Sequence, residues 1–227
     1  HQLASKTMIE ANYVGSSNTD LSLGARRGTA VTPGPGNPRE RFRFPYMLPT
    51  FFEKSIGRSN YNSLQLSMKR SFTTGFAATA AYTWAKSIDI GCSGFFGAEG
   101  CSVQNEFDLN ADRGPSANNI GHYFVGSIVY DLPFGRGQRF GGGASRAVDA
   151  VIGGWQINTL MNFRQGLGYN VTVPGDLANI GNTGTYLRAN LVGDPNLSKP
   201  TPERWFDTSA FAAPGPFTFG NLGRNRL

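Results

Sequence analysis

The sequence predicts an all-β fold, in which about five long antiparallel strands form a transmembrane β-barrel segment with long extracellular loops. Three observations predict it. Apolar and polar residues alternate in five segments, short and long connections alternate between them, and 30 Gly and 13 Pro accompany only 16% charged residues. Such alternation is typical of strands with one face toward lipid and the other toward a polar lumen. We therefore expect residues 1–227 to be a partial outer-membrane β-barrel domain, which in isolation forms an open, curved sheet.

Each segment is expected to be a strand of about 9–11 residues, the length that crosses a bilayer at the tilt of a barrel strand. The fifth segment alternates most clearly, whereas the two faces of the fourth are poorly distinguished. The expected lipid-facing residues are, strand by strand, Ile9, Ala11 and Tyr13; Leu64, Leu66 and Met68; Phe76, Ala78, Ala80, Tyr82 and Trp84; Phe124, Gly126, Ile128, Tyr130 and Leu132; and Trp155, Ile157, Met161 and Phe163.

The opposite faces of the second and fifth segments supply the candidate site residues. In a transporter, polar side chains on this face contact solute in the lumen. Each is also an ordinary lumen residue, so none is expected to be a specific ligand. The lumen-facing candidates are Gln65, Ser67, Lys69, Gln156, Asn158 and Arg164.

The connections distinguish a barrel from a soluble β-sandwich, whose strands would alternate in the same way. Outer-membrane barrels have short periplasmic turns and longer extracellular loops. Residues 73–75 read as a tight turn and 135–143 as a Gly- and Arg-rich link, so both are expected in the periplasm. Residues 15–59, 89–118 and 174–227 are long connections and are expected outside the cell.

Aromatic residues are expected near both ends of the strands, where Trp and Tyr favour the membrane–water interfaces. The alternative is that aromatic residues simply favour strands of any sheet. The outer set would be Tyr13, Tyr61, Tyr82 and Trp84, and the inner set Phe72, Phe76, Tyr130 and Trp155.

The ends of the chain indicate a fragment. It begins at His1 without the charged and apolar regions of a signal peptide, and it stops at Leu227 within loop-like sequence. No run approaches the 18 or so apolar residues of a spanning helix. We expect this piece to lack a signal peptide, a plug and the terminal strand of a barrel.

No residue pattern predicts catalysis, a cofactor or a metal centre, so the chain is not expected to be an enzyme. Asp108 and Asp112 have the spacing that opens a calcium-binding loop, but Arg113 and Asn119 stand where that loop needs Gly and Glu. A solvated loop is the favoured interpretation, and a looser calcium site stays open. The net charge of +6 comes from scattered basic residues, so no nucleic-acid partner is expected.

Cys92 and Cys101 lie close together in a connection that is expected outside the cell. An even pair in a flexible loop of an exported protein favours a disulfide, formed in the oxidising periplasm. The alternative is two free thiols in a reducing compartment.

Several motifs in one order resemble the barrel of Oar-like TonB-dependent outer-membrane transporters. They include Ala81-Tyr82-Thr83-Trp84-Ala85-Lys86-Ser87 and Tyr130-Asp131-Leu132-Pro133-Phe134-Gly135, with further matches at 59–66, 69–72, 111–116, 153–156, 190–195, 203–207 and 217–225. The resemblance implies a 22-stranded barrel closed by a plug, in the lipid of a Gram-negative outer membrane. It also implies energised uptake of an unidentified solute, driven by an inner-membrane energy-coupling protein through the plug. The chain itself shows no plug, no coupling box, no carboxypeptidase-like regulatory domain and no terminal aromatic strand.

Two other functions remain open at this stage. An outer-membrane barrel could serve surface adhesion or secretion support through its long loops. A soluble secreted β-sandwich could act as a binding module.

Overall fold

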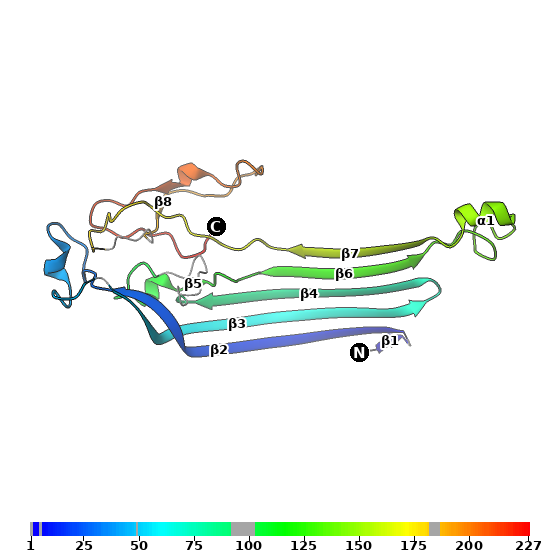
Figure 1. Cartoon of the computed structure of the whole chain (residues 1–227), viewed down its shortest axis with the longest axis horizontal. Coiled ribbons are helices and arrows are strands. Elements are labelled where there is room, and N and C mark those ends of the chain that lie inside the picture. Colours follow the sequence, from blue (N-terminus) through cyan, green and yellow to red (C-terminus); the bar gives the residue numbers. More distant parts are fainter. Residues whose placement is uncertain (1, 5, 49, 92–102, 182–186) are drawn as a thin grey trace. The chain divides into compact units, whose positions relative to one another are not determined.

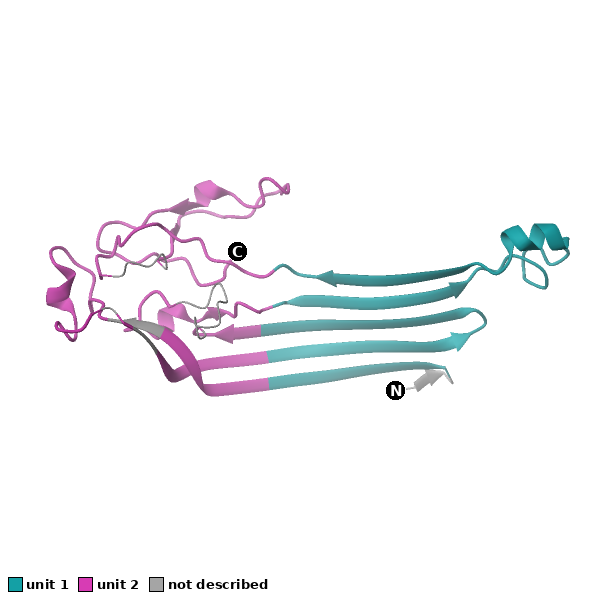
Figure 2. Cartoon of the chain, viewed as in Figure 1, with its two compact units in different colours: residues 1–15, 62–86, 120–166 teal, residues 16–61, 87–119, 167–227 magenta. Residues whose placement is uncertain are grey.

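The computed structural model describes residues 2–4, 6–48, 50–91, 103–181 and 187–227 (Figure 1). The chain divides into two compact units (Figure 2). Unit 1 comprises residues 1–15, 62–86 and 120–166, and unit 2 comprises residues 16–61, 87–119 and 167–227. Among the described residues, no helix is long and apolar enough to cross a membrane.

The main sheet confirms the predicted all-β fold. Its strands follow the order β1-β2-β3-β4-β6-β7, so each strand pairs with its neighbour in the chain, and β5 pairs with β4 (Figure 1). The described strands leave β1 and β7 as two edges, as expected of an open segment. The strands are β1 (Gln2–Ala4), β2 (Thr7–Arg27), β3 (Thr50–Thr73), β4 (Phe76–Asp89), β5 (Gly114–Pro115), β6 (His122–Asp131) and β7 (Gln156–Arg164).

All five predicted segments are strands, but the expected common length is wrong. β2 has 21 residues and β3 has 24, about twice the expected span. The predicted connection over 15–59 is therefore mostly strand, and residues 28–49 alone join β2 to β3.

Polar side chains explain the extra length of these two strands. Within unit 2, Asn18 Nδ2 donates to Ser59 Oγ at 3.1 Å, and Ser22 Oγ donates to Glu53 Oε2 at 2.8 Å. Asn, Ser and Glu do not alternate with apolar residues here, so periodicity gives no strand signal. Cross-strand hydrogen bonds between polar residues nevertheless stabilise the ladder.

The predicted tight turn between β3 and β4 is confirmed. Thr74 and Gly75 form the turn, with φ of 49° and 75°. Two central residues with positive φ define a type I′ turn, whose twist matches the twist of a two-stranded hairpin. Gly adopts this conformation without strain, but the β-branched Thr74 does not.

The connection between β6 and β7 contains a helix that the all-β prediction missed. Helix α1 (Arg146–Ile152) is seven residues long, and Ser145 Oγ caps it by accepting a hydrogen bond from the Val148 N–H at 3.4 Å. This connection lies in unit 1 (Figure 2).

Unit 2 is packed and not merely a set of loops. Its small core consists of Ala30, Phe42, Val173, Ala178, Ile180, Leu187 and Ala189. Unit 2 also contains short elements, among them η1 (Pro38–Arg41), η3 (Leu109–Asp112), η4 (Thr208–Ala210) and the β8–β9 pair (Asn190–Leu191 with Phe211–Ala212). The connections predicted to be long therefore include a folded part that the sequence did not predict.

Candidate functional site

Unit 1 has an apolar face built by the register of β4, β6 and β7. Ala80 lies opposite Gly126, which lies opposite Met161, so the three side-chain positions share one face. We define the apolar face as these residues together with those at alternate positions from Phe76 to Trp84, from His122 to Tyr130 and from Ile157 to Phe163, where the three strands pair. It contains no Asp, Glu, Lys or Arg; its members are Phe76, Ala78, Ala80, Tyr82, Trp84, His122, Phe124, Gly126, Ile128, Tyr130, Ile157, Thr159, Met161 and Phe163.

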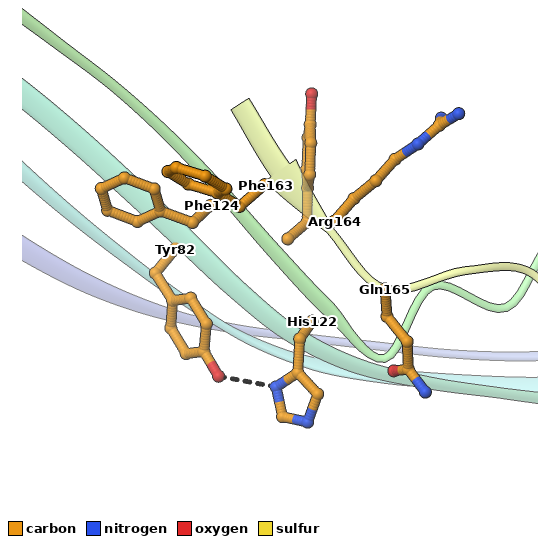
Figure 3. Close-up of a pocket in the computed structure, with 7 residues that line it drawn as sticks. Tyr82, His122, Phe124, Phe163, Arg164 and Gln165 are labelled. Atoms are coloured by element: carbon orange, nitrogen blue, oxygen red, sulfur yellow. Dashed lines mark hydrogen bonds between the residues drawn. The ribbon is translucent and has the colours of Figure 1, made fainter. Parts of the chain in front are cut away.

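Aromatic side chains form a row across one end of the apolar face. Tyr82 lies opposite Phe124, which lies opposite Phe163, and the last two rings stack with centroids 6.2 Å apart. Next to this row, the Tyr82 hydroxyl lies 2.7 Å from His122 Nδ1 (Figure 3). These residues line a shallow hollow of about 280 Å³ together with Arg164 and Gln165. His122 thus contacts the aromatic row through Tyr82, in agreement with a structural role.

A second aromatic row lies at the other end of the same face. Phe76 and Tyr130 face each other edge-on with centroids 6.2 Å apart, and Ile157 is the next residue in the row. Eight residue steps separate Phe76 from Trp84, about 27 Å along the strand, or roughly 20 Å along the membrane normal at a tilt of about 40°. This spacing suits the apolar band of an outer-membrane barrel, about 25 Å tall between two aromatic girdles.

The polar face lies on the other side of β4, β6 and β7. Gln156, Asn158 and Arg164 all lie on it at alternate positions of β7. Gln156 Nε2 donates to Asp131 Oδ1 at 2.7 Å, and Asn158 Nδ2 donates to Gln156 Oε1 at 3.0 Å. The polar face also carries apolar residues, among them Val125, Val129 and Leu160, of which Leu160 is 81% exposed.

The other three candidates share one face of β3. Ser67 Oγ donates to Glu10 Oε2 on β2 at 3.2 Å, while Lys69 is exposed and Gln65 is half-buried. The structure therefore groups Gln65 with Ser67 and Lys69 on one strand, and Gln156 with Asn158 and Arg164 on another. Their contact with a lumen stays a prediction.

A buried ionic network in unit 2 escaped the sequence analysis. Arg188 Nη1 lies 2.5 Å from Asp112 Oδ1, and Arg224 forms a second buried ion pair with Asp89. Gln104 joins these elements, because its side-chain oxygen accepts from the Arg188 N–H and its amide nitrogen donates to the Gly220 carbonyl. The network holds η3 and the end of β4 against the segment from 187 to 225. It contains hydrogen-bonded charges without a free ligand position.

The expectation of a solvated loop at Asp108–Asp112 is wrong for Asp112. Its side chain is fully buried, and its carboxylate oxygens are taken by Arg188 and by the Gln104 N–H at 3.0 Å. Asp108 instead caps η3 by accepting from the Ala111 N–H. Among the described residues, no group of three or more His, Cys, Asp or Glu could hold a metal ion. The structure thus gives these two carboxylates structural partners.

Two titratable groups outside the strands have shifted pKa values. Hydrogen bonds from the Ser209 hydroxyl and backbone N–H lower the pKa of Asp207 below its ordinary value of 3.8, and Arg204 lowers it further. Burial raises the pKa of the Tyr169 phenol above its ordinary value of 10.0. Both shifts have local causes, the hydrogen bonds of the η4 turn for Asp207 and burial for Tyr169.

Comparison with known protein families distinguishes a membrane barrel from a soluble β-sandwich. The family model for an outer membrane beta barrel domain matches residues 1–227. The chain belongs to this family. Comparisons with curated proteins and with solved structures give no match.

As an outer membrane beta barrel domain, the chain resides in the outer membrane, and the soluble β-sandwich interpretation is wrong. The apolar face is then the lipid-facing surface of the barrel wall. The Thr74–Gly75 turn and the β6–β7 connection lie at the same end of unit 1, because Phe76, Tyr130 and Ile157 are aligned. Outer-membrane barrels have short turns on the periplasmic side, so the short Thr74–Gly75 turn assigns that end of unit 1 to the periplasm. The disulfide between Cys92 and Cys101 stays a prediction, because both residues lie outside the described residues.

Proposed function

We propose that this chain forms part of the barrel wall of a TonB-dependent receptor that takes up a solute with energy from the inner membrane. The polar face opposite the two aromatic rows carries this proposal. Its amide and hydroxyl groups, such as Asn158 and Ser127, suit a wall along which a hydrated solute passes. The motif order that resembles Oar-like transporters adds independent support.

The length of β2 and β3 also supports a large receptor. A membrane span takes about 9–11 residues, whereas these strands have 21 and 24. The additional residues carry polar cross-strand pairs such as Asn18 with Ser59. Strands that continue in a polar environment are suited to a receptor that first captures its solute outside the bilayer.

The proposal gives the protein three partners. Outer-membrane lipid contacts the apolar face, an unidentified solute contacts the polar face, and an inner-membrane energy-coupling protein acts through a plug domain in the full-length protein. We propose no catalytic step and no nucleic-acid partner. Charged and hydrogen-bonding groups such as Asp112 and Arg188 serve to hold the fold.

Surface adhesion or secretion support is the second candidate, and the connection between β2 and β3 favours it. Tyr46 is fully exposed, and Leu48 is 66% exposed. Exposed apolar residues in a connecting loop are typical of a contact with another macromolecule.

Uptake by intact cells separates the two functions. The full-length protein is produced in cells that otherwise lack it, and a radiolabelled cell hydrolysate serves as the probe. Energised transport predicts accumulation above the control strain, with loss of the increase when a protonophore collapses the proton-motive force. Adhesion predicts unchanged accumulation together with altered attachment to surfaces, and this result would reject the transport proposal.

A further inference from the structure

Exposed apolar side chains gather on the connection between β6 and β7. Val151 is 69% exposed, Trp155 is 61% exposed, and Phe134, Phe140 and Val148 are each about half exposed. Five such residues within 22 positions are unusual for a surface that faces only water.

This connection is folded, so the exposure belongs to a defined surface. The Phe140 N–H donates to the Pro133 carbonyl at 3.0 Å, and the Gly135 N–H donates to the Phe140 carbonyl at 2.9 Å. The Asp149 carboxylate on α1 accepts from the Arg136 N–H at 2.6 Å, which ties the helix to the loop. The Phe134 and Phe140 rings pack against each other with centroids 5.7 Å apart, and both remain about half exposed on this folded connection.

The exposed surface continues the lipid-facing one. The Leu132 N–H donates to the Trp155 carbonyl at 2.8 Å, so the ladder extends one residue beyond β7 and Trp155 shares the apolar face with Ile157. Trp155 Nε1 in turn donates to the Val151 carbonyl at 2.8 Å. Val148 and Val151 are three residues apart on α1, so they share one side of the helix, and the hydrogen bond from Trp155 joins its ring to the end of that helix.

The charges of the connection complement an anionic surface. Between residues 132 and 155 the charged residues are Arg136, Arg139, Arg146 and Asp149. The Asp149 carboxylate already accepts a backbone hydrogen bond, and the Arg139 guanidinium lies over the Phe140 ring at 5.5 Å. Arginine beside exposed aromatic residues suits the headgroup region of a membrane, where apolar parts enter the acyl chains and guanidinium groups meet phosphate.

We propose that the β6–β7 connection is a membrane-interface anchor that binds anionic phospholipid of the periplasmic leaflet. Val148, Val151 and Trp155 enter the edge of the acyl region, while Arg136, Arg139 and Arg146 contact the phosphates. This inference rests on the outer-membrane location and goes beyond the proposed transport, so it holds whether the barrel transports or adheres.

A spin label at position 151 tests the depth of the helix. The full-length protein carries Val151→Cys in a background without other cysteines, in vesicles of phosphatidylcholine and phosphatidylglycerol at about three to one. We expect the label to be more accessible to oxygen than to a water-soluble nickel chelate. The matched control is Val192→Cys, a similarly exposed valine of unit 2, whose label should favour the nickel chelate. Preference of the 151 label for the chelate would overturn the proposal.

Removal of the arginines tests the lipid class. The triple variant Arg136→Gln, Arg139→Gln, Arg146→Gln should lose its preference for phosphatidylglycerol over phosphatidylcholine, measured by native mass spectrometry of retained lipid. Each charge near an anionic surface changes affinity about fivefold, so the combined loss should exceed tenfold. Arg39→Gln with Lys199→Gln, both exposed residues of unit 2, is the matched control and should retain the preference.

Three further outcomes would reject the proposal. An unchanged lipid preference in the triple variant would show that the arginines do not bind headgroups. If lipopolysaccharide vesicles without phosphatidylglycerol protect the label at position 151 from the nickel chelate as well as the phospholipid vesicles do, the assignment to the phospholipid leaflet is rejected. A label that is protected only in whole cells would point to a periplasmic protein as the occupant.

Discussion

Arg188 and Asp112 form a buried ion pair across 76 residues of sequence, with side chains that are 3% and 0% exposed. The Asp112 backbone carbonyl also accepts from Arg224 Nε at 3.0 Å. Two arginines from the C-terminal segment therefore converge on one residue of η3. Charges that are buried with complete hydrogen bonding fix one arrangement of the chain, because any other would leave a charge unpaired.

Asp112→Asn should destabilise unit 2 severely. The substitution keeps the shape but leaves Arg188 buried without its counter-charge, which costs about 3–5 kcal/mol for pairs of this kind. We expect faster hydrogen exchange over residues 103–119 and 187–227 of the full-length protein, with strands β6 and β7 unchanged.

The exposed pair between Arg204 and Asp207 supplies the control for this experiment. Asp207→Asn removes the same charge from the surface, where water already screens it, and should leave exchange over 103–119 unaltered. Equal exchange in Asp112→Asn and the unmodified protein would show that the ion pair does not hold the two segments together.

The sequence predicted the membrane-facing half of this fold because lipid imposes a pattern. Positions such as Ala80, Gly126 and Met161 must avoid charge whatever lies next to them, so alternation alone reveals the strand and its faces. The turn at Thr74–Gly75 was predictable for a similar reason, since a short polar link ending in Gly between two alternating runs is a local signal.

The other parts of the structure were not predictable, because they depend on contacts between residues far apart in the sequence or on elements too short to give a pattern. Asp112 looks like any loop carboxylate until Arg188 folds against it, and nothing near either residue indicates the other. The polar residues of β2, such as Asn18, form a strand only because Ser59 lies opposite. Helix α1 is short and lies in a Gly-rich link, so neither length nor periodicity indicated it.

Acid should loosen the turn at η4. The pKa of Asp207 is lower in the folded chain than in the unfolded chain, so its stabilisation is complete above the unfolded value and is lost as pH falls through the folded value. We expect the protection of residues 205–212, normalised to exchange of the unfolded chain at each pH, to decrease on acidification below 3.8.

Asp207→Asn should abolish this pH dependence, because the amide cannot titrate. Asp194→Asn alters a comparable turn, in which Asp194 accepts from the Asn196 N–H, and should preserve it. The assignment to Asp207 fails if its asparagine variant still loses protection in acid.

A substitution at Thr74 should stabilise the β3–β4 turn, whereas a substitution at Gly75 should destabilise it. Thr74 and Gly75 both have positive φ, which costs a residue with a Cβ about 1–2 kcal/mol. Thr74→Asn creates the residue pair most favoured in type I′ turns and should raise resistance to unfolding in detergent. Gly75→Ala should lower it.

Heat-modifiable migration on gels measures both variants, since folded barrels run faster than unfolded ones. Gly143→Ala is the control, because its added Cβ meets no atom within 4 Å and its φ is not positive. Identical melting of Gly75→Ala and Gly143→Ala would mean that the turn geometry does not limit stability.

The two faces of β7 predict opposite responses to one charge. Met161 lies in the middle of the apolar face opposite Gly126, and Asn162 points to the polar face opposite Val125. Met161→Arg places a guanidinium in the hydrocarbon, which costs about 2–4 kcal/mol near the midplane of a barrel. Asn162→Arg puts the same side chain one residue along, on the polar face, where it points away from the hydrocarbon. Folding yield of the full-length protein into phospholipid vesicles from urea should therefore decrease for Met161→Arg and stay near the unmodified level for Asn162→Arg. Equal yields would contradict a lipid-facing role for the apolar face, and a selective loss in Asn162→Arg would mean that the two faces have been assigned the wrong way round.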